Sequence, residues 1–319
     1  MMKHINFRKS SKLGFYLRCF WQSLTPRVLR ISAKNKLLSS IPVENIDYLN
    51  NRVDYYLKQQ EPFNLAKDAV TLSNYKLNGK SAYFYDLKNI LNYFPLNKKI
   101  RYLFGDVTHV ENTPTIVKSR PINGDNKNSV LMKLDTVRHF NFIKDENAHK
   151  DKKNMVVWRG KLFEGKQPHR EVFFKATKDL QYCNIGKTNN NGKNLDWVKA
   201  PMSITEQLKY KFVFCVEGND VATSLKWVMS SHSIALMCKP KFETWFMEGT
   251  LVAGKHYIEL KEDYSDLAEK IAYYSEHTDE ALEIVHNANT YVEQFKNAKQ
   301  ERLVSLLVME KFFELSGQN

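Results

Sequence analysis

A regular alternation of short apolar segments and amphipathic segments after residue 155 constrains the fold of this chain more than any other feature. Strands that alternate with helices of this length favour a parallel sheet with helices on both faces. We expect strands at Met155–Trp158, Leu180–Asn184, Phe212–Val216, Ser233–Cys238 and His256–Leu260. We expect helices at Arg170–Lys178, Thr205–Lys209, Val221–Ser231, Phe242–Met247, Asp266–Ser275, Glu280–Gln294 and Ala298–Leu315. The sequence therefore predicts an α/β protein.

The first half of the chain carries a weaker pattern of the same kind. A helix is predicted at Asn50–Gln60, and short strands near Ser81–Tyr85, Ile100–Phe104, Thr115–Lys118 and Val130–Leu134. The segment Lys144–Asn154 is polar and charged throughout, which indicates a linker between two halves. Two such halves predict a cleft between them. Because open parallel sheets bind ligands beyond the carboxyl ends of their strands, we looked for chemistry in the strand-to-helix loops.

The composition excludes several classes of protein. With 319 residues, 43% of them hydrophobic and 26% charged, the chain is too apolar for a disordered protein and too charged for a membrane bundle. Its four cysteines stand singly, which excludes a disulfide scaffold or a zinc ribbon and favours a reducing compartment. No apolar run approaches the ~18–20 residues that span a bilayer, and no leader-like segment is present, so we expect a cytoplasmic protein without a signal peptide.

The net charge of +13 is concentrated at the N-terminal end. The first 40 residues hold no Asp or Glu, and their cations are Lys3, Arg8, Lys9, Lys12, Arg18, Arg27, Arg30, Lys34 and Lys36. The apolar residues among them, which give a helix one aromatic face flanked by cations, are Leu13, Phe15, Tyr16, Leu17, Phe20, Trp21 and Leu24. Such a helix can lie on an anionic membrane surface, or its aromatic residues can dock on the body of the protein. Nucleic acid ranks last as a partner, because no nucleic-acid-binding signature accompanies the charge.

Several common catalytic and metal-binding motifs are missing from the sequence. The segment Gly186-Lys187-Thr188 resembles the end of a P-loop, but Gln181 stands where that motif requires glycine. There is no G-x-G-x-x-G, H-E-x-x-H, G-x-S-x-G or D-x-D sequence, and the histidines are scattered. We therefore expect no metal and no cofactor. A nucleotide diphosphate would be neutralised by cationic side chains and helix N-termini instead.

One strand-to-helix connection has the composition of a phosphate cradle. The strand FVFCV is followed by Glu217-Gly218-Asn219-Asp220 and a predicted helix. Gly218 permits a tight turn and Asp220 is a natural N-cap, which would leave the first helical N–H groups free for phosphate, with Ser224 and Lys226 one turn further on. An ordinary capped connection fits this segment equally well.

Two other loops carry candidate chemistry. Arg159, Lys161 and Arg170 cluster after a predicted strand and could bind a diphosphate, although a solvated basic loop has the same composition. Asp106 follows Phe104-Gly105 at a strand end, where a carboxylate could act as a general base or simply form a turn.

Three segments, in this order, resemble glycosyltransferase family 90. They are WRGKLF…HREVFF, LKYKFVFCVEGNDVATSLKWVMSSHSIALM and ETWFMEGTLVAGKHYIELKEDYSDLAEKI. This family includes protein O-glucosyltransferases, capsule xylosyltransferases and bacterial lipopolysaccharide-core transferases. The resemblance extends roughly from Phe104 to Phe295, and EGNDVATSLKW is most similar to the bacterial members.

The resemblance implies a GT-B fold, with two Rossmann-like domains facing a central cleft. The charge pattern sets apart a basic amphipathic arm (1–45), and the resemblance implies an acceptor-binding domain (46–150), a nucleotide-sugar-binding domain (151–295) and a C-terminal helix that packs back on the first domain (296–319). It also implies metal-independent, inverting transfer from a UDP-sugar.

The same resemblance assigns roles to individual residues. Asp106 corresponds to the catalytic base. The residues expected to bind the donor are Arg159, Gly160, Lys161, Arg170, Gly218, Asn219, Asp220, Val221, Ala222, Thr223, Ser224, Lys226 and Glu243. Glu243 is the expected acceptor for a ribose hydroxyl, by analogy with other GT-B enzymes. Lys226 stands where many relatives have arginine, and Gly105 where they have arginine before the aspartate.

Together these observations predict a cytoplasmic hexosyltransferase, specific for UDP-glucose or UDP-galactose, that extends the lipopolysaccharide inner core. Residues 1–40 would hold it on the inner face of the inner membrane, where the acceptor is anionic and lipid-linked. A capsular polysaccharide or protein acceptor is an alternative. A nucleotide-sugar-binding protein without catalytic activity is another, because a fold does not fix a function.

Overall fold

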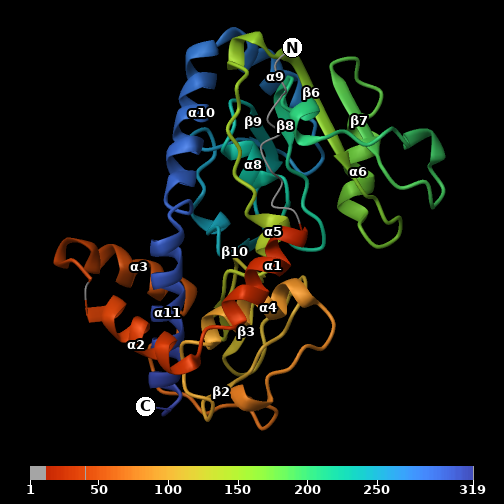
Figure 1. The fold of residues 1–319 in the computed structure, drawn as a ribbon. Helices are drawn as coiled ribbons and strands as arrows, with labels where there is room; N and C mark the ends of the chain where they lie inside the picture. The colour runs from red at the N-terminus through yellow and green to blue at the C-terminus, as the bar shows by residue number, and fades with distance from the viewer. Residues whose placement is uncertain (1–11, 40, 319) are drawn as a thin grey trace. The chain divides into compact units, whose positions relative to one another are not determined.

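The computed structural model describes residues 12–39 and 41–318, and the chain forms two compact units (Figure 1). Unit 1 contains the described residues up to Asn141, together with Lys241–Met247 and the segment from Phe295 onward. Unit 2 contains Phe142–Pro240 and Glu248–Gln294. The chain therefore enters unit 2 shortly before the predicted linker and returns twice to unit 1.

Unit 2 is built on a five-stranded parallel sheet, which confirms the α/β class. In chain order the strands are β6 (Lys153–Gly160), β7 (Cys183–Lys187), β8 (Tyr210–Phe214), β9 (Ile234–Cys238) and β11 (Ile258–Leu260). They lie in the order β11-β9-β8-β6-β7, so the first strand lies next to both the second and the third. This is the doubly wound arrangement of flavodoxin-like sheets.

Helices bury the apolar residues of this sheet. The helices of unit 2 are α6 (Pro168–Thr177), α7 (Ile204–Gln207), α8 (Leu225–Met229), α9 (Leu267–Glu276) and α10 (Thr278–Glu293). Phe173 and Phe174 of α6 pack with Trp158 of β6 and Phe214 of β8 in one continuous core, which residues of α9 and α10 complete. The strands are buried along most of their length, as expected for a parallel sheet covered on both faces.

Unit 1 combines helices with short strands. Its helices are α1 (Lys12–Ser23), α2 (Arg27–Ser39), α3 (Ile46–Tyr56), α4 (Ser81–Leu91), α5 (Thr136–His139) and α11 (Ala298–Leu315). Its strands form three pairs: β1 (Val70–Thr71) with β2 (Lys99–Ile100), β3 (Thr115–Val117) with β5 (Ser129–Leu131), and β4 (Ser119–Pro121) with β10 (Phe242–Thr244). Among its described residues unit 1 therefore has no sheet comparable to that of unit 2. Short 3-10 turns occur at Val43–Asn45, Leu72–Asn74, His149–Asp151, Leu195–Trp197 and Glu248–Thr250.

Three predicted elements differ from the structure. Ser81–Tyr85 begins helix α4, because Phe84, Leu87 and Leu91 recur at helical spacing and are buried. The segment Phe242–Met247, which was predicted as a helix, begins with strand β10, which pairs with β4. Thr244 and the aromatic residues next to it have a high propensity for β-strands. The predicted helix Val221–Ser231 is reduced to α8, which begins at Leu225.

The two N-terminal helices pack on unit 1. On α1, Phe15 and Cys19 are buried with Val137. On α2, Arg27 donates to the carbonyl of Leu91 (3.0 Å) and Lys34 pairs with Glu310 of α11. The prediction that aromatic residues of this helix dock on the body of the protein is therefore confirmed for Phe15. The side chains of Phe20 and Trp21 are 57% and 68% exposed. Residues 1–11 of the predicted arm lie outside the described residues.

Candidate active site

The connections that leave the two central strands of the unit 2 sheet, β6 and β8, run toward opposite edges of the sheet. From β6 the chain crosses to β7 at one edge, and from β8 it crosses to β9 on the opposite side. Since β6 and β8 are parallel neighbours, their carboxyl ends lie side by side. Ligands of open α/β sheets bind at such a point. The loop from Arg159 to Arg170 and the loop from Cys215 to Ser224 both start there.

Arg170 joins these two loops. Its guanidinium donates to the carbonyl oxygens of Glu217 (2.8 Å) and Val216 (3.3 Å) in the second loop, and to the carbonyl oxygen of Lys161 in the first. It also lies 5.4 Å from the ring centroid of Trp158. Burial lowers the pKa of Arg170 to about 10. The structure thus brings the two predicted donor loops together, with Arg170 holding their backbones.

A second pair of contacts reinforces this connection. Gln167 donates to the side-chain oxygen of Asn219 (3.3 Å), and the His169 ring nitrogen lies 2.9 Å from the carbonyl oxygen of Glu217. Gly160 is required by packing, because a Cβ there would lie 2.4 Å from the Trp158 ring. Gly218 has more room, since a Cβ there would lie 3.6 Å from Arg170 Nη2.

The turn before α8 presents unused backbone donors. The backbone amides of Val221, Ala222, Thr223 and Ser224 donate to no acceptor among the described residues. The prediction that Asp220 caps a helix beginning at Val221 is wrong, because Ser224 occupies the N-cap position of α8. Val221 and Ala222 are instead buried in the turn, which keeps this stretch out of the helix. Successive free amides in a turn can bind an anion without a helix.

The predicted donor cations have different surroundings. Arg159 donates to the carbonyl oxygen of Asn184 (2.8 Å) and to that of Ala200 (3.0 Å). Lys226 is fully buried and its ammonium lies 2.5 Å from the Glu248 carboxylate. Lys161 is exposed, and its side chain contacts no acceptor among the described residues. Of these three cations, Lys161 is the one available to a diphosphate.

Asp106 lies in unit 1, just beyond a short parallel pairing of Tyr102 with Ile116 in β3. Lys118, which follows β3, is 2% exposed at its side chain and lies 2.6 Å from the Asp106 carboxylate. The Asp106 side chain itself is 26% exposed. Its orientation is thus fixed from the inside by a buried cation, while part of the carboxylate remains accessible.

Gly105 has a specific reason to be glycine. Its φ of +127° disfavours other residues, and a Cβ there would lie 2.3 Å from the Lys80 ammonium. Lys80 donates to the carbonyl oxygen of Phe104 (2.6 Å). A cation at the N-cap position of α4 therefore reaches the backbone just before Asp106.

Two further ionisable groups neighbour Asp106. Burial raises the pKa of Tyr83 to about 12, and Lys118 opposes that shift. Burial also raises the pKa of Asp135, and Asp106 adds to this effect, whereas Arg138 and Lys118 oppose it. Asp135 adopts a left-handed φ of 55° immediately before α5.

Glu243 has partners within unit 1. Its carboxylate accepts hydrogen bonds from Arg120 (2.8 Å) and from the Tyr55 hydroxyl, and the residue is 1% exposed. It belongs to β10, which pairs with β4, and not to the unit that carries the donor loops. Its predicted contact with ribose therefore has no support in the local geometry.

The sequence prediction did not include two residues that form ion pairs with predicted site residues. Lys118 and Glu248 hold Asp106 and Lys226, respectively. Lys118 follows an apolar strand and Glu248 follows an aromatic cluster, but neither stands at a spacing that would indicate its partner.

We also searched residues 12–39 and 41–318 for metal ligands and membrane spans. Within these ranges no three His, Cys, Asp or Glu side chains are grouped as metal ligands. In the same part of the chain no helix has the length and hydropathy needed to cross a bilayer.

Comparisons with known proteins identify the relatives of this chain. The model of the family described as "Glycosyl transferase family 90" matches residues 131–305. O-glucosyltransferase LpsA of Dichelobacter nodosus is 39% identical over 311 residues, which cover 97% of each chain. Uncharacterized protein 179R of Invertebrate iridescent virus 6 is 29% identical over 103 residues, covering 30% of this chain and 9% of the viral protein. The chain belongs to glycosyltransferase family 90.

Proposed function

We propose that this protein is an inverting, metal-independent GT-B glycosyltransferase that moves a hexose from a UDP-sugar to a hydroxyl of the lipopolysaccharide inner core. Its full-length relative from Dichelobacter nodosus is named an O-glucosyltransferase, which favours glucose over galactose. The donor would bind to unit 2, and the acceptor, together with the catalytic base, to unit 1.

The observation that carries the proposal is the meeting of two loops at the carboxyl ends of β6 and β8. Arg170 joins the loops, the amides of Val221–Ser224 are unused, and Lys161 is exposed beside them. These groups suit a diphosphate, whose charge increases as it leaves the sugar. Donors fixed in advance stabilise that developing charge more than they stabilise the bound substrate, and so they lower the barrier.

Asp106 is the proposed base. In the reaction its carboxylate would accept the proton of the acceptor hydroxyl as that oxygen attacks the anomeric carbon from the side opposite UDP. A new C–O bond forms while the bond to the diphosphate breaks, and UDP keeps the electron pair. Lys118 holds the carboxylate in one orientation for this transfer.

The direct test is UDP release from a panel of UDP-sugars, with and without truncated lipopolysaccharide, in the presence of EDTA. We expect release from UDP-glucose that depends on the acceptor and is unaffected by EDTA. Binding of UDP without release from any donor would favour a binding protein. Release that requires capsular polysaccharide or protein in place of lipopolysaccharide would correct the acceptor.

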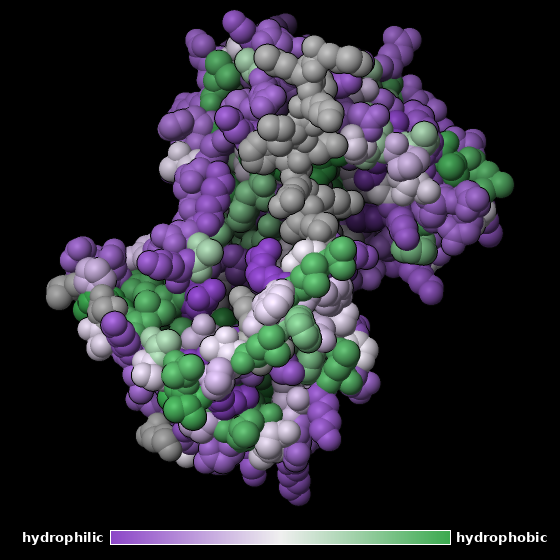
Figure 2. Space-filling view, viewed as in Figure 1, coloured by the Kyte–Doolittle hydropathy of each residue, from purple (hydrophilic) through white to green (hydrophobic). Residues whose placement is uncertain are grey.

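We further propose that α1 and the start of α2 attach the protein to the anionic inner face of the inner membrane. Seven apolar residues of this region are at least half exposed: Leu13, Leu17, Phe20, Trp21, Leu24, Val28 and Leu29. Figure 2 shows apolar residues over the part of the surface where α1 lies in Figure 1. Lys12 and Arg18 on the same helix would contact anionic headgroups.

Sedimentation with vesicles tests this attachment. We expect the protein to bind vesicles that contain phosphatidylglycerol more than neutral vesicles, and we expect F20S/W21S to lose most of that binding. Leu195→Ser, which changes an equally exposed residue of unit 2, is the matched control. Equal binding by the double variant and the wild type would contradict the proposal.

A further inference from the structure

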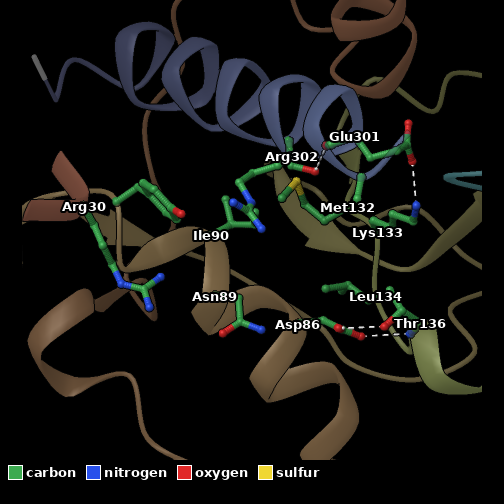
Figure 3. Close-up of a pocket in the computed structure, with 13 residues that line it drawn as sticks. Arg30, Asp86, Asn89, Ile90, Met132, Lys133, Leu134, Thr136, Glu301 and Arg302 are labelled. Carbon is green, nitrogen blue, oxygen red and sulfur yellow. Dashed lines mark hydrogen bonds and ion pairs between the residues drawn. The ribbon is translucent and has the colours of Figure 1, made fainter. Parts of the chain in front are cut away.

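A cavity of about 200 Å³ lies within unit 1, apart from the donor loops (Figure 3). Its walls come from α2, from α4 and the turn after it, from the segment Met132–Thr136, and from α11. This volume is well below the roughly 300–1,000 Å³ of sites for drug-sized ligands, and so it suits a single sugar ring.

The lining combines the groups that proteins use to bind sugars. Asn89 and Ser305 supply amide and hydroxyl groups, Tyr93 supplies an aromatic ring, and Ile90 and Leu134 supply apolar surface. Hydrogen-bonding groups around a partly apolar wall recognise hydroxyls on one side of a ring and C–H groups on the other.

Two of the residues that line the cavity are arginines, which favour the binding of anionic ligands. Arg302 of α11 is exposed, and its guanidinium contacts no acceptor among the described residues. Arg30 of α2 is 6% exposed and lies 5.4 Å from the ring centroid of Tyr93. Guanidinium groups bind phosphate and carboxylate in a bidentate manner.

The acidic residues of the cavity do not cancel this charge. Glu301 is engaged by Lys133 (2.7 Å) and by Arg52 (2.7 Å). Asp86 accepts hydrogen bonds from the backbone and the hydroxyl of Thr136, both at 2.8 Å. Figure 3 shows the Lys133–Glu301 and Asp86–Thr136 contacts along one side of the cavity. Arg302 therefore remains as an uncompensated cation at the rim.

The cavity also adjoins the surroundings of Asp106. Thr136 lines it, and Asp135, the preceding residue, interacts electrostatically with both Asp86 and Asp106. A sugar bound in the cavity would therefore lie in the same unit as the proposed base.

We propose that this cavity binds an acidic sugar residue of the acceptor, with its phosphate or carboxylate group at Arg302 and Arg30. Its assignment to the acceptor rests on the proposed function, whereas its preference for an acidic sugar rests on the lining alone. The site would select acceptors that carry an anionic group next to the sugar that is modified.

Ligand-observed NMR and calorimetry with glucose 6-phosphate, glucuronate and glucose test the proposal. We expect at least one of the two acidic sugars to bind at least tenfold more tightly than glucose, and the tighter of the two to identify the anionic group. Arg302→Ala should weaken that binding at least fivefold, Arg302→Lys should weaken it less, and Lys299→Ala, which changes an exposed cation of α11 outside the cavity, should leave it unchanged.

UDP binding, measured on the same samples, separates this inference from the proposed function. Acidic-sugar binding that is absent, or that is equal in the wild type and Arg302→Ala, would overturn the inference whether or not UDP binds. Binding that depends on Arg302, in a protein that neither binds UDP nor transfers sugar, would support the anion site and overturn the proposed function.

Discussion

Two lysine–carboxylate pairs, one in each unit, have nearly the same contact distance and very different access to solvent. Lys226 and Glu248 of unit 2 lie 2.5 Å apart, with side chains 0% and 1% exposed. Lys118 and Asp106 of unit 1 lie 2.6 Å apart, and the Asp106 side chain is 26% exposed. A substrate can therefore reach the carboxylate of the second pair and neither member of the first.

This difference in solvent access is what distinguishes a pair that only supports the fold from a pair that a substrate could use. A buried pair must be kept intact, because removing one partner leaves an uncompensated charge in a medium of low dielectric constant. A partly exposed carboxylate held by a buried cation has one side left for a substrate proton. The comparison thus favours a structural role for Lys226 and is consistent with the proposed role of Asp106 as the base.

Asp106→Asn should have the largest effect. The amide keeps the shape of the side chain but does not accept a proton as a carboxylate does, so we expect transfer to fall by about 10²–10⁴-fold. UDP release in the presence of acceptor measures this, and UDP affinity should stay within twofold of wild type. A variant that transfers sugar at the wild-type rate would show that another residue is the base.

Lys226→Ala should lower stability more than it alters chemistry. Because the buried Glu248 would lose its contact with the Lys226 ammonium, we expect the free energy of unfolding to fall by about 3–5 kcal/mol, measured by urea denaturation. The double variant K226M/E248L removes both charges and should recover most of that loss. Unchanged stability in Lys226→Ala, with lost turnover, would instead favour the original prediction that Lys226 binds the diphosphate.

Asp86 offers a third carboxylate, which is half-buried and forms no ion pair with any of the residues 12–39 and 41–318. Burial raises its pKa from 3.8 to about 7, Asp135 adds to the shift, and Thr136 and Lys133 oppose it. Since the folded state then holds the proton more tightly, its contribution to stability is lost as the pH rises from about 4 to about 7, by up to about 1.4 kcal/mol per pH unit. Asp86→Asn should flatten this part of the stability profile in urea denaturation. An unchanged slope would show that Asp86 is ionised throughout this range.

Arg170 is a cation that donates to three backbone carbonyl oxygens and lies against the Trp158 ring. Loss of its guanidinium should loosen the two donor loops, and so we expect Arg170→Ala to weaken UDP binding by about fivefold, or about 1 kcal/mol, in calorimetry. Arg170→Lys should restore little, because an ammonium lacks the planar fork. Lys166→Ala is the matched control, because Lys166 is an exposed cation in the same loop, between Lys161 and Arg170. Equal weakening in both variants would mean that only net charge matters.

The sequence predicted unit 2 better than unit 1. All five strands of the unit 2 sheet occur within a few residues of their predicted positions, because most of them contain a buried apolar run; β7, with the sequence CNIGK, is the least apolar of them. In unit 1 the strands have two or three residues, too few for a periodicity to develop. At Ser81–Tyr85 the aromatic residues favoured a strand, whereas burial of Phe84, Leu87 and Leu91 on one face stabilises a helix.

The sequence indicated which loops form the candidate site, but it did not indicate the contacts between them. The sequence indicated that the loops around Arg170 and Gly218 carry donor residues, and the structure connects these two loops directly. Burial of Lys226 against Glu248, 22 residues away, has no local signal. The same is true of Lys118 beside Asp106, since ion pairs across a fold depend on the packing of whole elements.

The return of the chain to unit 1 has a consequence for biosynthesis. Helix α11 supplies Val304, Val308, Met309 and Phe312, none of which is measurably exposed, to the interior of a unit whose other helices belong to the first half of the chain. Domains usually complete their folding from the N-terminus onward during synthesis. Here unit 1 lacks part of its interior until α11 has been translated, whereas all segments of unit 2 precede α11 in the chain. A chain broken off within α11 would therefore carry a finished unit 2 attached to an unfinished, protease-sensitive unit 1.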